Sequence, residues 1–385
     1  MNVTISVLGR FHLFHVAKQL QDRGFLHRLI TSYPAFETVK YGIAKQNIKS
    51  LVIHEISNRI SVKLPQAMKS LFDPQYLVFE LFDHHASAHI PHDTEIFVGL
   101  SSGCLHSLRR AKKMGAKTVV ERGSTHILYQ RALLAEEYDR LGIKTQITHP
   151  QVVEKELAEY LEADFISVPS QFVKRTFLSQ GIPENRLILT AYGVNLKHFY
   201  PAPRKDEVFR IIHCGNLSIR KGVHYLLQAF GELKLPGAEL WLIGDLTAEI
   251  VPFLQKFSSA SVKLKGTFPE MELHEQLSQG SVFCLASIEE GLAMVQAMAM
   301  ACALPVICTT NTGGEDIIRD GQDGFIIPIR EVTAIKEKIL YFYENRDLCR
   351  AMGESARRRV QSGFTWTDYG NKMISHYRNI LQDRS

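Results

Sequence analysis

The chain has 385 residues, of which 45% are hydrophobic and 22% are charged, and its formal net charge is +5 at pH 7. These values are ordinary for globular proteins and exclude a disordered, fibrous or collagen-like chain. No apolar run approaches the ~18 residues of a membrane-spanning helix, and MNVTISVLGRFH lacks the pattern of a secretory signal. A chain of this length fits two domains.

The cysteines are scattered without a C-x-x-C pair, and most lie in apolar surroundings such as VFCLAS and PVICTT. A free thiol behaves there as a small hydrophobic group. We therefore expect reduced thiols and a cytoplasmic location. The basic excess is too small to predict nucleic-acid binding.

Short β-branched segments alternate with longer helical patterns, which is typical of parallel sheets covered by helices. The first half predicts strands at 3–9, 94–100, 117–122, 164–170 and 187–193. The second half predicts strands at 209–215, 239–245, 262–266, 281–287 and 304–310. Helical patterns separate them, for example at 224–233 and 291–302.

Residues 198–209 contain two prolines and four charges and predict an exposed linker. We expect an α/β protein with two Rossmann-like domains that face each other across a cleft, at 1–200 and 205–366. The segment 367–385 predicts a helix capped by Thr367. Its apolar residues recur at helical spacing, at Tyr369, Met373, Tyr377 and Ile380.

The segment HCGNLSIRKGVHYLLQAF has the features of a phosphate-binding loop. A strand ends at Cys214, Gly215 opens a loop, and Arg220 and Lys221 precede a helix. The free N–H groups and the dipole of a helix N-terminus favour an anion, and the two cations add to this preference. The alternative is a surface loop with incidental cations. Ser or Thr is missing after the lysine, so the loop is not that of a P-loop NTPase.

The segment SIEEGLAM places Glu289 and Glu290 after a predicted strand. Ligands bind at such carboxyl ends in α/β sheets. Gly313 and Gly314 follow the next strand, so backbone can approach a ligand closely there. The carboxylates serve either as ligand groups or as partners of the helix N-terminus.

The order of these motifs resembles the C-terminal half of family 4 glycosyltransferases, which have the GT-B fold. The motifs are G-x-L-x-x-x-K-G, E-G-L-x-M, A-x-A-C-x-L-P-V-I-x-T and G-G, with YGVNLKHFYP before them and FTW after them. They extend from about Tyr192 to Trp366, and the first half is similar only in layout. The resemblance implies that the domain at 1–200 binds the acceptor, that the domain at 205–366 binds the nucleotide sugar, and that the helix at 367–385 crosses back onto the first domain. The resemblance implies retaining transfer of a hexose from a nucleotide-diphosphate sugar to a hydroxyl of a glycan, lipid-linked or small-molecule acceptor.

The resemblance also implies a catalytic set of Glu290, Lys221 and His126. Lys221 matches the lysine that neutralises the donor diphosphate, and Glu290 matches a glutamate beside the reacting sugar. His126 is similar to a histidine that contacts donor sugar and acceptor; the alternative is a loop histidine that caps its own turn. Asn216 stands where the family often has arginine, and Arg220 is expected to supply that charge.

The remaining donor contacts implied by the resemblance come from loops of both halves. They are Gly9, Arg10, Gly215, Lys265, Gly266, Thr267, Gly291, Leu292, Ala293 and Met294. Met298 replaces the glutamate that holds the ribose in the family. A thioether is a poor partner for a hydroxyl, and Gln296 lies about one turn away.

No Asp-x-Asp pair occurs in the sequence. We therefore expect cations and helix N-termini to bind the diphosphate without a metal, and no cofactor besides the donor substrate. His85 and His89 could form a zinc site with His92 or Asp83. Because Pro91 interrupts the pattern, a solvated helix end is the preferred interpretation.

Arg109, Arg110, Lys112 and Lys113 form a cationic run that is either a solvated helix face or a contact with anionic lipid head groups. The second interpretation would place the protein peripherally on the inner face of the membrane, near a lipid-linked acceptor. Residues 357–359, all arginines, are expected to complement a helix C-terminus.

Three other functions remain open. A nucleotide-sugar epimerase and a non-catalytic nucleotide-sugar-binding protein would have the same fold. A nicotinamide-dependent dehydrogenase also has paired Rossmann-like halves, but the first strand here is followed by G-R-F-H-L-F instead of G-x-G-x-x-G. The family resemblance suggests polysaccharide or glycoconjugate assembly as the biological setting.

Overall fold

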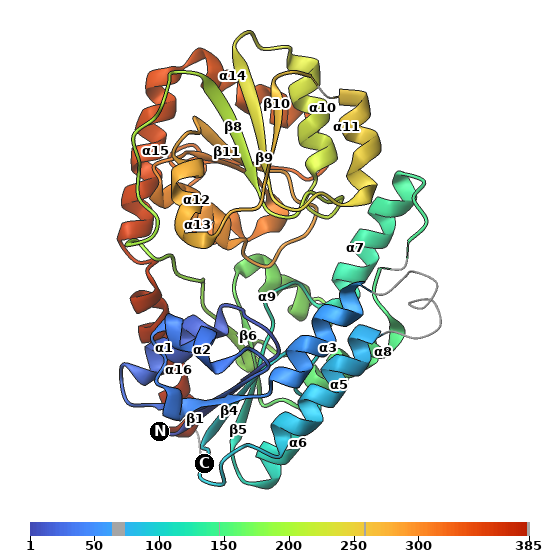
Figure 1. The fold of residues 1–385 in the computed structure, drawn as a ribbon, viewed down its shortest axis with the longest axis vertical. Coiled ribbons are helices and arrows are strands. Elements are labelled where there is room, and N and C mark those ends of the chain that lie inside the picture. The colour runs from blue at the N-terminus through green and yellow to red at the C-terminus, as the bar shows by residue number, and fades with distance from the viewer. Residues whose placement is uncertain (64–73, 146, 258, 383–385) are drawn as a thin grey trace.

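The computed structural model describes residues 1–63, 74–145, 147–257 and 259–382, which form two α/β units (Figure 1). In this described part the first sheet has seven parallel strands in the order β3-β2-β1-β4-β5-β6-β7. They are β1 (Val3–Val7), β2 (Leu26–Thr31), β3 (Ile48–Ser50), β4 (Ile96–Leu100), β5 (Lys117–Glu121), β6 (Phe165–Val168) and β7 (Leu187–Leu189).

Helices cover both faces of this sheet. They are α1 (Leu13–Gln21), α2 (Ala35–Thr38), α3 (Val52–Lys63), α5 (Pro74–Ser87), α6 (Leu105–Lys113), α7 (Ile127–Arg140), α8 (Pro150–Glu162) and α9 (Gln171–Leu178). Single 3-10 turns lie at Val39–Tyr41, Lys45–Asn47 and Glu184–Arg186.

The second sheet has six parallel strands among the described residues, in the order β10-β9-β8-β11-β12-β13. They are β8 (Phe209–Cys214), β9 (Ala238–Ile243), β10 (Val262–Gly266), β11 (Val282–Leu285), β12 (Val306–Thr309) and β13 (Gly324–Ile327). Its helices are α10 (Val223–Leu233), α11 (Val251–Phe257), α12 (Glu270–Leu277), α13 (Met294–Ala301), α14 (Val332–Glu344) and α15 (Arg346–Gln361). Single 3-10 turns lie at Ala248–Ile250, Thr310–Thr312 and Gly314–Asp316.

The apolar composition of the strands follows from their position. Parallel strands covered on both faces become continuous apolar segments, and β1 and β8 are buried along almost their whole length. The apolar helix α13 is likewise buried, between the second sheet and α15.

The predicted strands are confirmed, but most end earlier than expected. The segment 187–193, for example, forms a strand only to Leu189. Three strands were not predicted, namely β2, β3 and β13. His27 and Arg28 interrupt the apolar pattern of β2 because their side chains bond to Asp93 Oδ1 (2.8 Å) and the His89 carbonyl (3.2 Å) beside the sheet.

The last helix, α16 (Trp366–Gln382), lies against α1 of the first unit. Arg23 donates a hydrogen bond of 2.6 Å to Asn371 Oδ1 across this contact. The predicted cap at Thr367 is wrong. Thr365 caps the helix, because its Oγ1 accepts from the Asp368 N–H (3.2 Å) while the Asp368 carboxylate accepts from the Thr365 N–H (2.9 Å).

The two chain connections between the units run side by side. The Val194 N–H donates to the Phe364 carbonyl at 2.8 Å, and Val194 forms a parallel bridge with Thr365. Across the described ranges, we find no helix both long and apolar enough to cross a membrane.

Candidate active site

A cavity of about 550 Å³ lies between the carboxyl ends of the two sheets. The first unit contributes residues that follow β1, β4 and β5, including His12 and Arg122. The second unit contributes residues that follow β8 and β11, including Gly215, Lys221 and Glu290. Ligands of open α/β sheets bind at this edge, so the cavity is the candidate active site.

Lys221 and Glu290 meet in this cavity as an ion pair between Nζ and Oε1. Lys221 precedes α10, and Gly222 follows it with φ +64°. A Cβ at Gly222 would lie 1.8 Å from the Ala286 carbonyl oxygen, so only glycine permits this close approach. The ammonium group is thereby held next to the helix N-terminus, where an anion is favoured.

Arg220 does not line the cavity, but its Nη2 lies 3.9 Å from Oε1 of Glu290. Its Nε donates to Glu289 Oε2 at 2.8 Å, and the buried Glu289 carboxylate spans the two units. Glu289 Oε1 accepts from Ser124 Oγ (2.7 Å) and from Thr125 Oγ1 (2.7 Å), and Oε2 accepts from Gln130 Nε2 (2.9 Å). Burial raises the pKa of Glu289, but Arg220 and these hydrogen bonds outweigh it and lower the pKa to about 2.

Gly291 brings the two units into backbone contact beside this carboxylate. A Cβ at Gly291 would lie 2.0 Å from the Gly123 carbonyl oxygen. The Gly291 carbonyl accepts a hydrogen bond of 2.7 Å from Ser170 Oγ. The loop that carries Glu290 is therefore held by the first unit on both sides.

His126 lies outside the cavity. Its Nδ1 accepts from the Leu128 N–H at 3.3 Å and caps α7, as the alternative interpretation expected. The ring packs between Tyr160 and Phe177, with centroid distances of 5.0 and 4.9 Å. Burial, with the Arg122 charge, lowers the pKa of His126 to about 4.

The loop and helix after Glu290 supply most of the other predicted contacts. Leu292, Ala293, Met294 and Met298 all line the cavity. Gln296 does not replace the missing ribose contact, because its side chain is buried and donates to the Thr312 carbonyl at 3.0 Å.

The two predicted contacts in the loop after β1, Gly9 and Arg10, do not line this cavity. Gly9, with φ +80°, donates its N–H to Ser32 Oγ at 2.7 Å. Arg10 bonds to the Tyr41 hydroxyl and lines a separate cavity of about 940 Å³, which is bordered by the first unit and by Phe268 and Glu270 of the second. Arg10 therefore lies between the two units but outside the cavity that holds Lys221 and Glu290, and its predicted contact with the donor stays a prediction.

The predicted residues at the end of β10, and Asn216 after β8, also lie outside the cavity. The Lys265 ammonium lies 4.1 Å from the centroid of the Trp241 ring. Asn216, Gly266 and Thr267 are exposed. The structure thus gathers one part of the predicted site, the Lys221–Glu290 pair with the loop after it.

Several cavity residues escaped the sequence prediction, and His12 and Arg122 are two of them. His12 Nε2 bonds to Glu121 Oε1 at 2.9 Å, and Arg122 bonds to Glu156 Oε1 at 2.9 Å. Both follow strands of the first sheet, so the rule that ligands bind at carboxyl ends could have found them. The unpredicted Tyr192 ring also lines the cavity.

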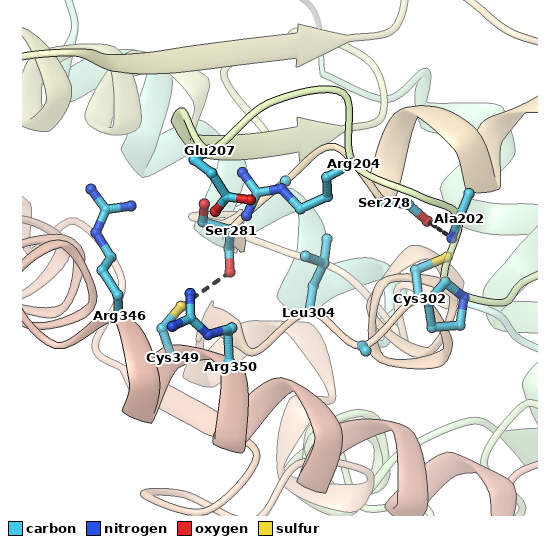
Figure 2. A pocket seen from close by; sticks show the side chains of 13 residues that line it. Ala202, Arg204, Glu207, Ser278, Ser281, Cys302, Leu304, Arg346, Cys349 and Arg350 are labelled. Atoms are coloured by element: carbon cyan, nitrogen blue, oxygen red, sulfur yellow. Dashed lines mark hydrogen bonds between the residues drawn. The ribbon is translucent and has the colours of Figure 1, made fainter.

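A further cavity of about 570 Å³ lies at the amino ends of β8 and β11, away from the candidate site (Figure 2). Arg204, Arg346 and Arg350 border it. Arg204 NH2 donates to the Val208 carbonyl (2.6 Å), and Arg346 Nε donates to the Tyr343 carbonyl (2.7 Å). None of the predicted site residues, all of which are described, borders this cavity.

The histidine and arginine clusters have partners within the first unit. His85 Nδ1 lies 2.8 Å from His54 Nε2, and the buried Asp83 accepts from the Ser107 N–H at 3.0 Å. Within the described ranges, no group of three or more His, Cys, Asp or Glu side chains is arranged to hold a metal ion. Arg109 and Lys112 form ion pairs with carboxylates of the same unit.

The second unit is similar in sequence to known proteins. Residues 197–359 match the family model of the glycosyl transferases group 1. The putative glycosyltransferase EpsD of Bacillus subtilis is 30% identical over 184 residues, 43% of this chain and 48% of that protein. N-acetyl-alpha-D-glucosaminyl L-malate synthase of Bacillus anthracis is 27% identical over 191 residues, 49% and 48% of the two chains. This chain spans about half the length of these relatives.

Solved structures have the same fold as this chain over almost its whole length. A sucrose-phosphate synthase from Thermosynechococcus elongatus has a TM-score of 0.74 at 16% identity and covers 99% of both chains. Alr3699/HepE of Anabaena, in complex with UDP, has a TM-score of 0.71 at 13% identity and covers 98% of this chain and 100% of its own. The two-sheet arrangement is the GT-B fold, as predicted.

Proposed function

We propose that this chain, whose residues 197–359 belong to the group 1 glycosyltransferases, transfers a sugar from a nucleotide-diphosphate sugar to an acceptor hydroxyl with retention of configuration. The observation that carries the proposal is the Lys221–Glu290 pair in the cavity between the two sheets. The pair places an ammonium group that can bind a diphosphate next to a carboxylate that can stabilise positive charge on the sugar carbon.

In the proposed reaction, the bond between the anomeric carbon and the diphosphate oxygen breaks, and its electron pair goes to the diphosphate. The acceptor oxygen forms the new bond on the same face of the sugar, and its proton goes to the departing diphosphate. Lys221 stabilises the negative charge that grows on the leaving group. The Glu290 carboxylate faces the positive charge that develops at the anomeric carbon.

The second unit is proposed to bind the donor and the first unit to bind the acceptor. Gly215 and the residues from Leu292 to Met294 line the cavity beside the Lys221 ammonium, where the diphosphate and sugar would lie. An ammonium at a helix N-terminus supplies the positive potential that a divalent metal supplies elsewhere. We therefore propose diphosphate binding without a metal.

The names of the relatives support a polysaccharide or glycoconjugate as product. They include a capsular polysaccharide biosynthesis glycosyltransferase, CapM, of Staphylococcus aureus. One structure of the Anabaena protein contains UDP-glucose. UDP-sugars are therefore the first donors to examine.

A thermal-shift panel of nucleotide sugars tests the proposed function. A ligand at 100 times its Kd adds about 2.7 kcal/mol of stability, so a donor should raise the melting temperature of the wild type and not that of Lys221→Ala. If no nucleotide sugar shifted the wild type, the proposal would be wrong. Product analysis without acceptor detects an epimerase, which would form a second nucleotide sugar.

A non-catalytic nucleotide-sugar-binding protein is the second candidate function. It is favoured by Met298, which lines the cavity where a ribose-binding glutamate was expected. A donor that stabilises the protein, with no release of nucleoside diphosphate over hours and with every acceptor tried, would support it.

A further inference from the structure

His12 forms part of the cavity wall that belongs to the first unit. It follows β1 and precedes α1, and its Nε2 lies 2.9 Å from Oε1 of Glu121, the last residue of β5. The Glu121 carboxylate is 1% exposed. A histidine in the cavity is thus held by a carboxylate beneath it.

The carboxylate determines which ring nitrogen is left for a ligand. An ionised carboxylate only accepts hydrogen bonds, so in the neutral form of His12 that pairs with it Nε2 carries the proton and Nδ1 keeps its lone pair. The Tyr192 ring, 4.3 Å away between centroids, packs against the imidazole and restricts its rotation. In the described structure, the hydrogen bond of the ring is made by Nε2, so Nδ1 is available as an acceptor.

We propose that Nδ1 of His12 accepts a hydrogen bond from the acceptor hydroxyl before the reaction and holds its oxygen toward the reacting sugar carbon. As the diphosphate departs, the hydroxyl turns this proton away from Nδ1 and gives it to the diphosphate oxygen. This inference rests on the proposed function. His12 is then a catalytic residue that contacts substrate, and Glu121 is a positioning residue that acts through it.

The position of His12 favours the acceptor over the donor as its ligand. The imidazole lies on the first unit, whereas Lys221 and Glu290 border the same cavity from the second unit. A neutral imidazole does not attract a diphosphate. It does accept a hydrogen bond from a hydroxyl.

The same His12–Glu121 bond could instead only anchor α1 to β5, and two substitutions separate the roles. In His12→Gln the amide nitrogen takes the place of Nε2, so the bond to Glu121 is kept and the acceptor at the δ position is lost. In His12→Asn the amide oxygen takes the place of Nδ1, so the acceptor is kept and the anchor is lost. The matched control is His27→Gln. It alters a histidine–carboxylate pair of 2.8 Å at the amino ends of the strands, whereas the cavity lies at their carboxyl ends.

The experiment uses the full chain and the nucleotide sugar that stabilises the wild type most, with water as acceptor. Release of nucleoside diphosphate gives kcat and KM, and thermal shifts report fold and donor binding. We expect His12→Gln to keep the donor-induced shift and KM but to lose about 10²-fold in kcat, the scale of a misplaced reacting group. His12→Asn should keep more activity than His12→Gln, and His27→Gln should match the wild type.

Each other outcome would overturn a defined part of this picture. A kcat for His12→Gln within threefold of the wild type would make His12 an anchor only. Loss of the donor-induced shift in His12→Gln would assign His12 to the donor side. A wild type that binds nucleotide sugars and releases no nucleoside diphosphate, with water and with every acceptor tried, would remove the proposed transfer, and this inference with it.

Discussion

At the scale of single residues, Lys221 is the side chain on which the proposed chemistry most depends. Its ammonium is held by Glu290 in the cavity and lies at the start of α10. Lys221→Ala should lower kcat by about 10² to 10³-fold, as for other groups that stabilise transition-state charge. Steady-state kinetics measures this. Lys336→Ala, which removes an exposed ion pair with Glu232, is the control and should leave kcat unchanged.

The Glu289 carboxylate predicts a pH dependence of stability. Its pKa is lowered from 4.5 to about 2 in the folded state. Its ionised form therefore stabilises the fold above about pH 4.5, and this contribution disappears as the pH falls toward 2. Between pH 6 and 3.5 the loss is about 1.4 kcal/mol. Urea unfolding at both pH values should show a steeper loss for the wild type than for Glu289→Gln; parallel losses would contradict the assignment.

Ala303 lies in a backbone conformation that favours glycine. It follows α13 with φ +61°, a conformation that costs a residue with a Cβ about 1–2 kcal/mol. Glycine also gives the unfolded chain more conformational entropy, which offsets part of this gain. Ala303→Gly should therefore raise the free energy of unfolding by about 0.5–1 kcal/mol. Ala299→Gly, inside the same helix, should lower it by about 1 kcal/mol. Denaturant unfolding compares the two, and a loss of stability in Ala303→Gly would refute the prediction.

At this scale the sequence predicted part of the site. Lys221 and Glu290 were predicted because each belongs to a local motif of glycine, charge and helix start. Glu121 was not, because its role depends on His12, more than a hundred residues earlier in the chain. The local motif also marked Arg220 as a cation of the site. It could not show that the Arg220 Nε would bond to Glu289, whose carboxylate is held by residues of the first unit.

At the scale of secondary-structure elements, the contact between α16 and α1 depends on a glycine. A Cβ at Gly370 would lie 2.7 Å from Gln19 Cβ. Gly370→Val should therefore separate the helices and lower stability by about 1–3 kcal/mol, as overpacking does. Urea unfolding measures the change. Ser375→Val, on the exposed side of α16, is the control, and equal losses in both variants would remove the packing explanation.

Elements with continuous apolar patterns were predicted well, and short or polar ones were not. The segments at β8 and β11 are apolar because helices cover both faces of their sheet. The strand β3 has three residues, all half-buried. Such a strand has no distinguishing pattern, since its existence depends on pairing with β2. Long-range pairing of this kind is absent from local sequence.

At the scale of the whole molecule, the buried carboxylate of Glu137 forms a brace between the two units, at a position outside the cavity. Glu137 on α7 accepts from Tyr225 OH (2.8 Å) and Arg330 Nε (2.6 Å), and lies 3.1 Å from His224 Nε2. These three partners belong to the second unit. The brace and the Glu289 network together hold the units in this arrangement.

Removing the charge of Glu137 weakens the buried hydrogen bonds that it accepts and leaves Arg330 paired with Glu136 alone, which costs about 1–3 kcal/mol. Glu137→Gln should therefore loosen the two units, with a larger radius of gyration in small-angle scattering and a lower unfolding temperature. Glu136→Gln is the control, because Glu136 pairs with Arg330 from a largely exposed position and such pairs contribute little. An unchanged radius in Glu137→Gln would show that the brace does not set the arrangement.

Because α16 packs on α1, the fold of the first unit can be completed only after the second unit has been synthesised. The second unit is contiguous in the chain, so its core can close soon after its last strand and helices emerge from the ribosome. The first unit has all its strands by Leu189, but the helix that covers α1 begins only at Trp366. At 5–20 residues per second, roughly ten to thirty seconds separate the two events. The part of the protein that is made first is therefore finished last.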